Sequence, residues 1–456
     1  MKPPVKCQGP VGITRRNMLQ AGAISALGLT LPQVLAAGDR LAGKRQAASA
    51  DSCILVFLNG GPSHLDTWDM KPDAPKELRS EFSSIDTTLP GLRVCEHLPK
   101  LAQVAKHCTL VRSVNHDQVA HAPAVYTALT GIKSNIRAGI MGAKPTDYPA
   151  IGAVVGQMRP TKSMLLPYVL LPYLTAEGAG GPPQPGFLGG MLGQTHDPLI
   201  VQQSGKTPDG LAMPALAFGP DMSPARVQER MQLLGGLNNG LNRPGQAQEM
   251  NALQARARDL LTSAAAQRAF ELDQESPRLR DAYGRNIYGQ SMLLARRLVE
   301  AGTRLTCVSW APDANATWDT HGANFAKLKK DLLPPFDTAF STLLTDLVER
   351  GMLERTLVVV MGEIGRTPAI NANAGRDHWG FCYTALLAGG GVKPGVLYGS
   401  SDQRGAHPRS NPVSATDLVA TIYHALGIPA DLEIHDRLSR PMPLLPDGAP
   451  VRELFA

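Results

Sequence analysis

Short apolar runs alternate with longer segments of helical periodicity in the C-terminal part of the chain, and this alternation constrains the fold more than any other feature. The runs "TRLTCVSW" (303–310) and "TLVVVMGE" (356–363) flank a helical pattern at 332–351. Strands separated by helices of this length predict right-handed crossovers and a parallel sheet covered on both faces. The sequence therefore predicts an α/β fold whose parallel or mixed sheet is sandwiched by helices.

Three further apolar runs fit the same pattern. They are "CILVFLNGG" (53–61), "KHCTLVRSV" (106–114) and "CYTALLAGGG" (382–391), and helical patterns occupy 121–131 and 414–427. Short continuous apolar runs that end in glycine or polar residues are typical of buried strands in a parallel sheet.

The segment from 160 to 300 departs from this alternation. Its first part, to about 220, is rich in Gly, Pro and Leu, whereas residues 223–301 have Leu, Met and Ala at helical spacing. We expect one domain over 51–456. Within it, 160–300 is expected to form a Gly/Pro-rich and helical insertion that packs on the core and shapes a cleft.

The first 50 residues have the features of an export signal. A charged start with Arg15 and Arg16 precedes a short Gly/Ala-rich apolar stretch that ends in small residues. This pattern resembles a twin-arginine signal, which implies the twin-arginine export machinery as a partner and a periplasmic or cell-envelope location. The alternative is a cytosolic protein with an accidental arginine pair. No other stretch is long and apolar enough for a transmembrane anchor.

The charge balance gives no support for nucleic-acid binding. Residues 1–50 carry seven of the 45 Lys and Arg residues and one of the 39 Asp and Glu residues, which leaves 38 of each in the remainder. A net charge near zero does not form the basic surface that nucleic acids require. The five cysteines after residue 50 contain no C-x-x-C pair, which argues against a disulfide framework or a zinc knuckle.

Polar residues follow four of the predicted strands. Ligands bind at the carboxyl ends of strands in such sheets, so these loops are the predicted site. Their histidine and carboxylate residues are His64, Asp66, His116, His121, Asp319, His321, Glu363, Asp377 and His378.

The Asp319–Thr320–His321 spacing places two metal-ligand types on one side of an extended loop. A carboxylate with an imidazole suits Zn, Mn or Fe better than Ca. The alternative is a hydrogen-bonded loop pair. Glu363 follows the apolar run "LVVVM" and needs a cation or donors at a buried strand end, and a structural ion pair with Arg366 is the alternative.

Asp377 either binds a metal, orients His378, or caps a turn.

Two other kinds of site are excluded by their missing motifs. No G-K-[ST] follows the glycines of "NGGPSHLDTWD", and no G-x-S-x-G is present. The chain therefore lacks a P-loop and a nucleophile elbow.

Several motifs together resemble the domain-of-unknown-function 1501 family of the alkaline phosphatase and sulfatase superfamily. They are "GGPSHLDTWDMKP", "WDTHGANF", "VVVMGEIGRTPAINANAGRDHW" and "DLVATIYHALGI". The resemblance implies an alkaline phosphatase-like fold and a divalent metal, with Zn first and Mn, Fe, Mg or Ca as alternatives.

The helix "HAPAVYTALTG" is similar to the sulfatase helix that begins Cys-x-Pro-Ser-Arg and ends Leu-Thr-Gly. By this resemblance His121 stands at the nucleophile position, while Ala124 and Val125 replace Ser and Arg. Asn59 stands where relatives have an Asp ligand at the end of the first strand.

The resemblance also assigns metal ligands. Asp319, His321 and His378 keep one of the two usual sites, whereas Glu363 keeps only the acid of the Asp-His-Gly found in relatives. The second site is either lost or rebuilt with His64, Asp66 or His116. The substrate is expected to contact Asn59, Ser63, Arg366 and Asp377.

The function implied is an exported, metal-dependent hydrolase of a phosphate or sulfate ester, with a small-molecule or glycan ester as substrate. Metal-activated water attacks directly, with His121 or His116 as general acid or base. A phosphorylated His121 is the alternative mechanism. Two other functions remain open: a catalytically altered, metal-stabilised protein that binds a glycan or envelope polymer, and a secreted iron oxidoreductase.

Overall fold

The computed structural model describes residues 47–455 apart from 137–138, 140, 162–164, 204–209, most of 213–262, and 314–317. Residues 48–456 form one compact unit. The predicted export segment lies outside the described residues except for its last four. Within the described ranges, no helix has the length and apolar character needed to cross a bilayer.

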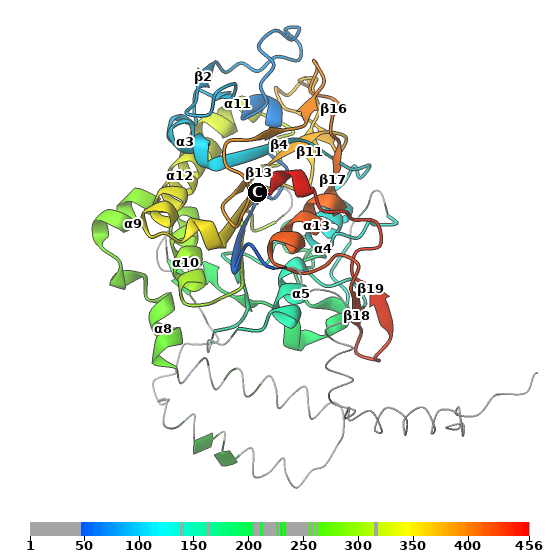
Figure 1. The fold of residues 1–456 in the computed structure, drawn as a ribbon. Helices are drawn as coiled ribbons and strands as arrows, with labels where there is room; N and C mark the ends of the chain where they lie inside the picture. Colours follow the sequence, from blue (N-terminus) through cyan, green and yellow to red (C-terminus); the bar gives the residue numbers. More distant parts are fainter. Residues whose placement is uncertain are drawn as a thin grey trace, which may run out of the picture. The chain divides into compact units, whose positions relative to one another are not determined.

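A mixed sheet forms the centre of the molecule (Figure 1). Its strands run in the order β14-β4-β13-β10-β1-β9-β5-β6, and β17 also pairs with β4. All pairings are parallel except those of β13, which is antiparallel to both neighbours. The strands are β14 (Leu397–Tyr398), β4 (Cys108–Asn115), β13 (Tyr383–Ala388), β10 (Thr356–Met361), β1 (Ser52–Phe57), β9 (Leu305–Ser309), β5 (Tyr168–Leu171), β6 (Leu199–Ile200) and β17 (Val413–Ser414).

The central strand β1 is buried along its whole length, between β10 and β9. Its side chains alternate between the faces of the sheet, so Ile54 and Val56 enter one core cluster and Leu55 and Phe57 enter the other. A strand covered on both faces is apolar without interruption, which is the pattern that the sequence shows.

Helices cover both faces of this sheet. On one face lie α3 (Pro99–Val104), α8 (Ala264–Phe270), α9 (Pro277–Tyr283), α10 (Ile287–Glu300) and α12 (Leu333–Glu349). On the other face lie α4 (His121–Thr130), α5 (Ile151–Met158) and α13 (Ala415–Ala425). The predicted α/β sandwich is confirmed.

The structure refines two details of the sequence prediction. The strand within 382–391 is antiparallel, so the sheet, which was predicted to be parallel or mixed, is mixed. The segment 160–300 is only partly an insertion, because β5 pairs with β9 inside the main sheet and α10 packs on β9 and β1.

Short elements occupy the loops and the sheet margins. They are α11 (Asn324–Lys327), β2 (Ser84–Asp86), β3 (Arg93–Cys95), β7 (Gln202–Gln203), β8 (Leu211–Ala212), β11 (Gly365–Arg366), β12 (His378–Trp379), β15 (Ser400–Ser401), β16 (Pro408–Ser410), β18 (Glu433–His435) and β19 (Pro441–Pro443).

Candidate metal centre

Loops from several strands meet at the carboxyl end of the sheet, and two glycines allow the close approach. Gly60 and Gly61 follow β1 and have φ values of 101° and 79°, a region that favours glycine. A Cβ atom on Gly60 would lie 2.3 Å from the backbone nitrogen of Asp319, and one on Gly61 would lie 2.2 Å from the carbonyl oxygen of Ile364. The loops after β1, β9 and β10 are therefore in direct backbone contact.

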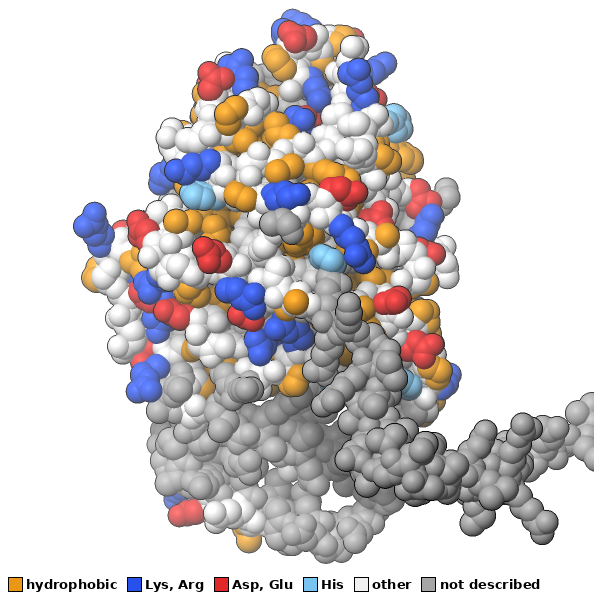
Figure 2. Space-filling model, viewed as in Figure 1, with side chains coloured by type: hydrophobic (Ala, Val, Ile, Leu, Met, Phe, Trp, Pro, Cys, Tyr) orange, Lys and Arg blue, Asp and Glu red, His pale blue; other side chains and the backbone are white. Residues whose placement is uncertain are grey.

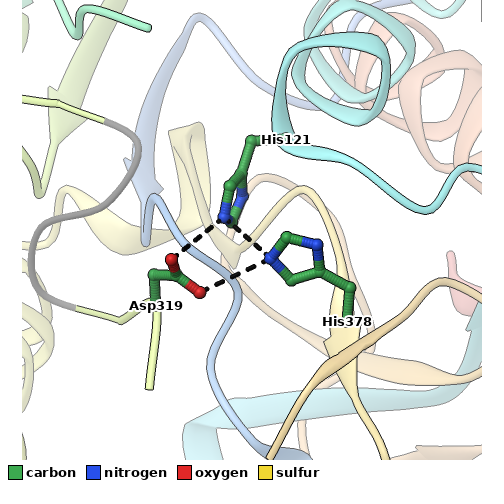
Figure 3. A group of neighbouring side chains, drawn as sticks. All are labelled: His121, Asp319 and His378. Carbon is green, nitrogen blue, oxygen red and sulfur yellow. Dashed lines mark hydrogen bonds and ion pairs between the residues drawn. The ribbon is translucent and has the colours of Figure 1, made fainter. Parts of the chain in front are cut away.

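His121, Asp319 and His378 point toward one another in this region (Figure 3). The Nε2 atoms of the two histidines are 2.9 Å apart. Asp319 places Oδ2 3.4 Å from His121 Nε2 and Oδ1 3.5 Å from His378 Nε2. A tetrahedral zinc site with Zn–N bonds of about 2.0–2.1 Å separates its donors by about 3.3 Å. The three spacings therefore suit donors to a single ion.

An acceptor fixes the second ring nitrogen of each histidine. His121 Nδ1 is 2.6 Å from Glu363 Oε1, and His378 Nδ1 is 3.0 Å from the carbonyl oxygen of Val119. A carbonyl or an ionised carboxylate can only accept, so each Nδ1 carries a hydrogen and donates it. The lone pair of each neutral ring then lies on Nε2, at the centre. Metal-binding histidines are oriented in this way.

Two Nε2 lone pairs at 2.9 Å repel each other unless a positive charge lies between them. Burial lowers the pKa of His121, but hydrogen bonds with Asp319 and Glu363 outweigh this effect and raise the pKa to about 9. A proton on His121 therefore satisfies the group when no metal is bound. A divalent cation in place of that proton would satisfy all three donors at once, so these residues fit a metal.

His321 joins this group from the exposed side. Its Nε2 is 3.0 Å from His378 Nε2 and 3.2 Å from Asp319 Oδ1, and its Nδ1 donates to Asp377 Oδ1 at 2.8 Å. The structure thus brings together the predicted set of Asp319, His321 and His378. It adds His121, which the sequence assigned to acid–base chemistry, as a fourth donor. The His321 side chain is 43% exposed, against 7% for His121.

Arg366 is buried and holds Asp319 in place. Its Nη2 lies 2.6 Å from Asp319 Oδ1, and the guanidinium also donates to the carbonyl oxygens of Gly60, Gly61 and Trp318. Burial raises the pKa of Asp319, but its histidine partners and the charge of Arg366 outweigh this and hold the pKa well below its usual value. Arg366 pairs with Asp319 rather than Glu363, and its donors are engaged within the protein. Its Nη1 donates to the carbonyl oxygen of Arg376, so all three nitrogens are bonded within the described residues and the side chain is buried instead of making the predicted substrate contact.

Three other predicted residues lie in a separate buried cluster. Both oxygens of Asp66 accept from Arg376, at 2.7 Å and 2.9 Å, and Ser63 donates to Asp66 at 2.6 Å. His64 hydrogen-bonds the carbonyl oxygen of Gly405 at 2.9 Å, and burial lowers its pKa. The carboxylate of Asp66 is neutralised by Arg376, so Asp66 and His64 form a structural support instead of the predicted second metal site, and the hydroxyl of Ser63, predicted to contact substrate, is bonded to Asp66.

His116 also supports the site without facing it. Its Nδ1 accepts from the backbone N–H of Gln118 at 3.1 Å, so its Nε2 carries the hydrogen and donates to the carbonyl oxygen of Glu363 at 2.6 Å. Burial lowers the pKa of this imidazole. Both ring nitrogens are occupied by backbone, which leaves His116 without the free nitrogen that the predicted proton transfer needs.

Glu363 and Asp377 contact histidines of the group. Glu363 is 1% exposed and accepts from His121 and from the backbone N–H of Gly60, at 2.9 Å. Asp377 accepts from His321 and from Asn371. Glu363 was predicted to bind the metal directly, but its geometry fits the orientation of His121 instead.

Arg376 and a chain of polar side chains that reaches Asn59 were not predicted from the sequence. Asn59, predicted to contact substrate, accepts from Ser309 at 2.8 Å, and its amide nitrogen is 3.5 Å from Gln184 Oε1. Gln184 in turn donates to Glu177 at 2.9 Å. Arg376 lies one residue before Asp377, but Gln184 and Glu177 lie in the Gly/Pro-rich segment, where no periodicity marks them.

The fold and the site define an α/β protein with a histidine and aspartate group at the carboxyl ends of its parallel strands, suited to a divalent metal. The chain belongs to the family described as "Protein of unknown function (DUF1501)", which matches residues 50–455. No curated protein matches the sequence.

Several solved structures are similar at low identity. Ps i-CgsB is 13% identical, with 83% of this chain and 72% of that chain covered and a TM-score of 0.41. The PsFucS1 sulfatase from Pseudoalteromonas sp. is 11% identical, with coverage of 86% and 70% and a TM-score of 0.40. The alkaline phosphatase from the Antarctic bacterium TAB5 is 13% identical, with coverage of 83% and 98% and a TM-score of 0.35.

Proposed function

We propose that this protein is an exported, metal-dependent hydrolase that cleaves a phosphate or sulfate ester with water. One observation carries the proposal: Asp319 and the Nε2 atoms of His121 and His378 converge within 4.8 Å of one another. Each of the two histidines also has an acceptor at its other nitrogen. A bound divalent cation supplies Lewis acidity to this site, which makes water a stronger nucleophile and polarises an ester oxygen.

The residues of the chain divide the remaining tasks. His121, Asp319, His378 and His321 would hold the cation. Glu363 keeps His121 in the tautomer whose lone pair faces the centre, and Asp377 does the same for His321. Arg366 keeps Asp319 ionised and fixed. In this arrangement His121 Nε2 is a metal donor, which favours direct attack by water over a phosphorylated His121.

Zinc is the proposed metal, because imidazole with one carboxylate suits zinc well. Mn, Fe, Mg and Ca are the alternatives, and iron would favour the oxidoreductase function. We further propose export through the twin-arginine machinery and a small-molecule or glycan ester as substrate. Figure 2 shows Lys and Arg side chains interspersed with Asp and Glu on the face seen there, which supports the proposal that nucleic acid is not a partner.

A second function, binding of a glycan or envelope polymer without catalysis, is favoured by α4 itself. The helix begins His-Ala-Pro-Ala-Val, so the position of the sulfatase nucleophile has neither a hydroxyl nor a thiol. The protein would then keep a metal only for stability.

The test compares turnover of aryl phosphate monoesters, phosphate diesters and sulfate esters by protein loaded with Zn, Mn, Fe, Mg or Ca. We expect turnover that is lost in His378→Ala and retained in the control His435→Ala, whose histidine is exposed on β18. If the fully metal-loaded protein turned over none of these esters, the proposed hydrolase function would be wrong and the binding function would remain.

A further inference from the structure

His321 is the most exposed of the four donors at the metal centre. Its side chain is 43% exposed, against 7% for His121, 8% for Asp319 and 19% for His378. The last three converge within 4.8 Å of one another. His321 approaches two of them from the exposed side, at 3.0 Å from His378 and 3.2 Å from Asp319. If the His321 ring left, the three more buried donors would still face one another.

The contact that orients the His321 ring is also exposed. Its Nδ1 donates to Asp377 Oδ1 at 2.8 Å, and the Asp377 side chain is 55% exposed. Solvent screens such a pair, so it contributes little to holding the ring. Asp377 Oδ1 also accepts from Asn371 Nδ2 at 3.0 Å, so the carboxylate keeps a partner when the ring leaves. By contrast, Glu363, which accepts from His121, is 1% exposed.

The backbone around His321 is held in place by the loop that contains Asn371. Asn371 Nδ2 donates to the carbonyl oxygen of His321 at 2.9 Å, and the backbone N–H of Arg376 donates to the carbonyl oxygen of Thr320 at 3.1 Å. A Cβ atom on Gly375 would lie 2.0 Å from the His321 carbonyl oxygen, so the two backbones are in direct contact. Exposed side chains change rotamer readily. The ring can therefore leave the centre by rotation about its own side-chain bonds, while the backbone stays fixed.

Four protein donors would fill the coordination shell of a tetrahedral zinc ion. Structural zinc sites are closed in this way, whereas catalytic sites have three protein donors and an open position for water or substrate. The hydrolysis proposed above needs such a position. Either one of the four donors leaves, or the ion accepts a fifth ligand.

We propose that His321 is an exchangeable donor, which binds the cation in the resting protein and gives up its position to an oxygen of the ester. This inference rests on the proposed hydrolase function. His121, Asp319 and His378 hold the cation throughout, while the His321 ring turns toward solvent. No covalent bond forms or breaks in this step. The site is therefore closed at rest and opens when the substrate binds.

The test follows the histidine ligands of cobalt-substituted protein by proton NMR. Paramagnetic cobalt shifts the ring protons of each coordinated histidine far outside the normal range, so His121, His321 and His378 should each give a set of shifted signals. His321→Ala should lack one set, which assigns that set to His321, and should still bind cobalt. Saturating inorganic phosphate should remove the same set from the spectrum of wild type and leave the other two.

The matched control is His435→Ala, whose histidine is exposed on β18 and which should give the same spectra as wild type. The inference would be overturned if the His321 signals persisted while cobalt broadened the ³¹P resonance of phosphate, because the ion would then have accepted a fifth ligand. Loss of cobalt from His321→Ala, or the absence of the His321 signals from resting wild type, would also overturn it.

A separate outcome concerns the proposed function itself. Inorganic phosphate and sulfate are the anions that the proposed hydrolysis would release. If neither anion changed the cobalt spectrum of wild type or of His321→Ala, the proposed hydrolase function would be wrong. If phosphate reached the ion in His321→Ala but not in wild type, His321 would be a permanent ligand and only the exchange would be wrong.

Discussion

His121 is held between two carboxylates, and this position determines its chemistry. Its Nδ1 is 2.6 Å from Glu363 and its Nε2 is 3.4 Å from Asp319. An imidazole that donates to a buried carboxylate is oriented and made more basic, which strengthens a metal bond at the opposite nitrogen. His321 has the same pattern with Asp377, but that pair is far more exposed.

Glu363→Gln should therefore lower metal affinity by about 10–100-fold, because the ring of His121 loses its charged acceptor. Asp377→Asn should have a smaller effect, because solvent screens the exposed pair. Competition with a chromophoric chelator measures both affinities, and Glu433→Gln serves as the control. Equal affinities in wild type and Glu363→Gln would show that Glu363 does not act through His121.

The titration of His64 should contribute to the pH dependence of stability. Burial lowers its pKa in the folded state, while the unfolded chain protonates it near the ordinary value of about 6.5. Stability contributed by the neutral ring is therefore complete above about pH 6.5 and is lost as pH falls toward the folded pKa.

When the pH falls from about 7.5 to about 5.5, the unfolding free energy of wild type should decrease by about 1 kcal/mol more than that of the variant His64→Gln. Urea denaturation of metal-free protein at both pH values measures this difference. An identical loss in the two proteins would mean that His64 titrates normally in the folded state.

At the residue scale, the sequence predicted the ligand types but not which carboxylates are free to bind metal. Asp319 and Asp66 look alike in the sequence, since each follows a strand. The structure separates them, because Asp66 is paired through both oxygens with Arg376 while Asp319 keeps contacts with three histidines. That difference depends on arginines distant in sequence.

Among the elements, the loop after β1 controls how closely the site can assemble. In the sequence, the glycines at 60 and 61 mark the end of a predicted strand and do not continue into a P-loop, and in the structure they also let three loops share backbone contacts. The sequence shows that glycine is present, but only the fold shows which backbone comes within reach of it.

Gly60→Ala tests this role. The substitution should destabilise the protein by more than the roughly 1–2 kcal/mol cost of a left-handed backbone, because its Cβ would lie 2.3 Å from the backbone of Asp319. It should also weaken metal binding. The control Gly351→Ala has a positive φ of 66° but no atom within 4 Å of its Cβ, so it measures the backbone cost alone. If Gly60→Ala and Gly351→Ala changed the unfolding free energy and the metal affinity equally, the close backbone approach at Gly60 would not be needed for the site.

The strand directions show what periodicity can and cannot predict. The elements around 303–363 were predictable because long apolar runs alternate there with helices. The antiparallel direction of β13 follows from the helix-free connection between 361 and 383, since a parallel neighbour needs a crossover. The four-residue strand β5 lies among prolines and has no periodic neighbour, so its place in the sheet depends on tertiary pairing with β9.

For the whole molecule, a single ion would join parts of the chain that are distant in sequence. His121 begins a helix on one face of the sheet, Asp319 follows β9, and His378 lies in the loop between β10 and β13. We propose that these residues bind one divalent metal, with His321 nearby.

The most direct measurement is an anomalous difference map from crystals of the metal-loaded protein, collected at the absorption edge of the bound metal. If these residues bind one ion, the peak should lie about 2.0–2.2 Å from His121 Nε2, His378 Nε2 and an Asp319 carboxylate oxygen. A metal-saturated crystal whose peak lies away from these three residues, or that has no peak, would contradict this proposal.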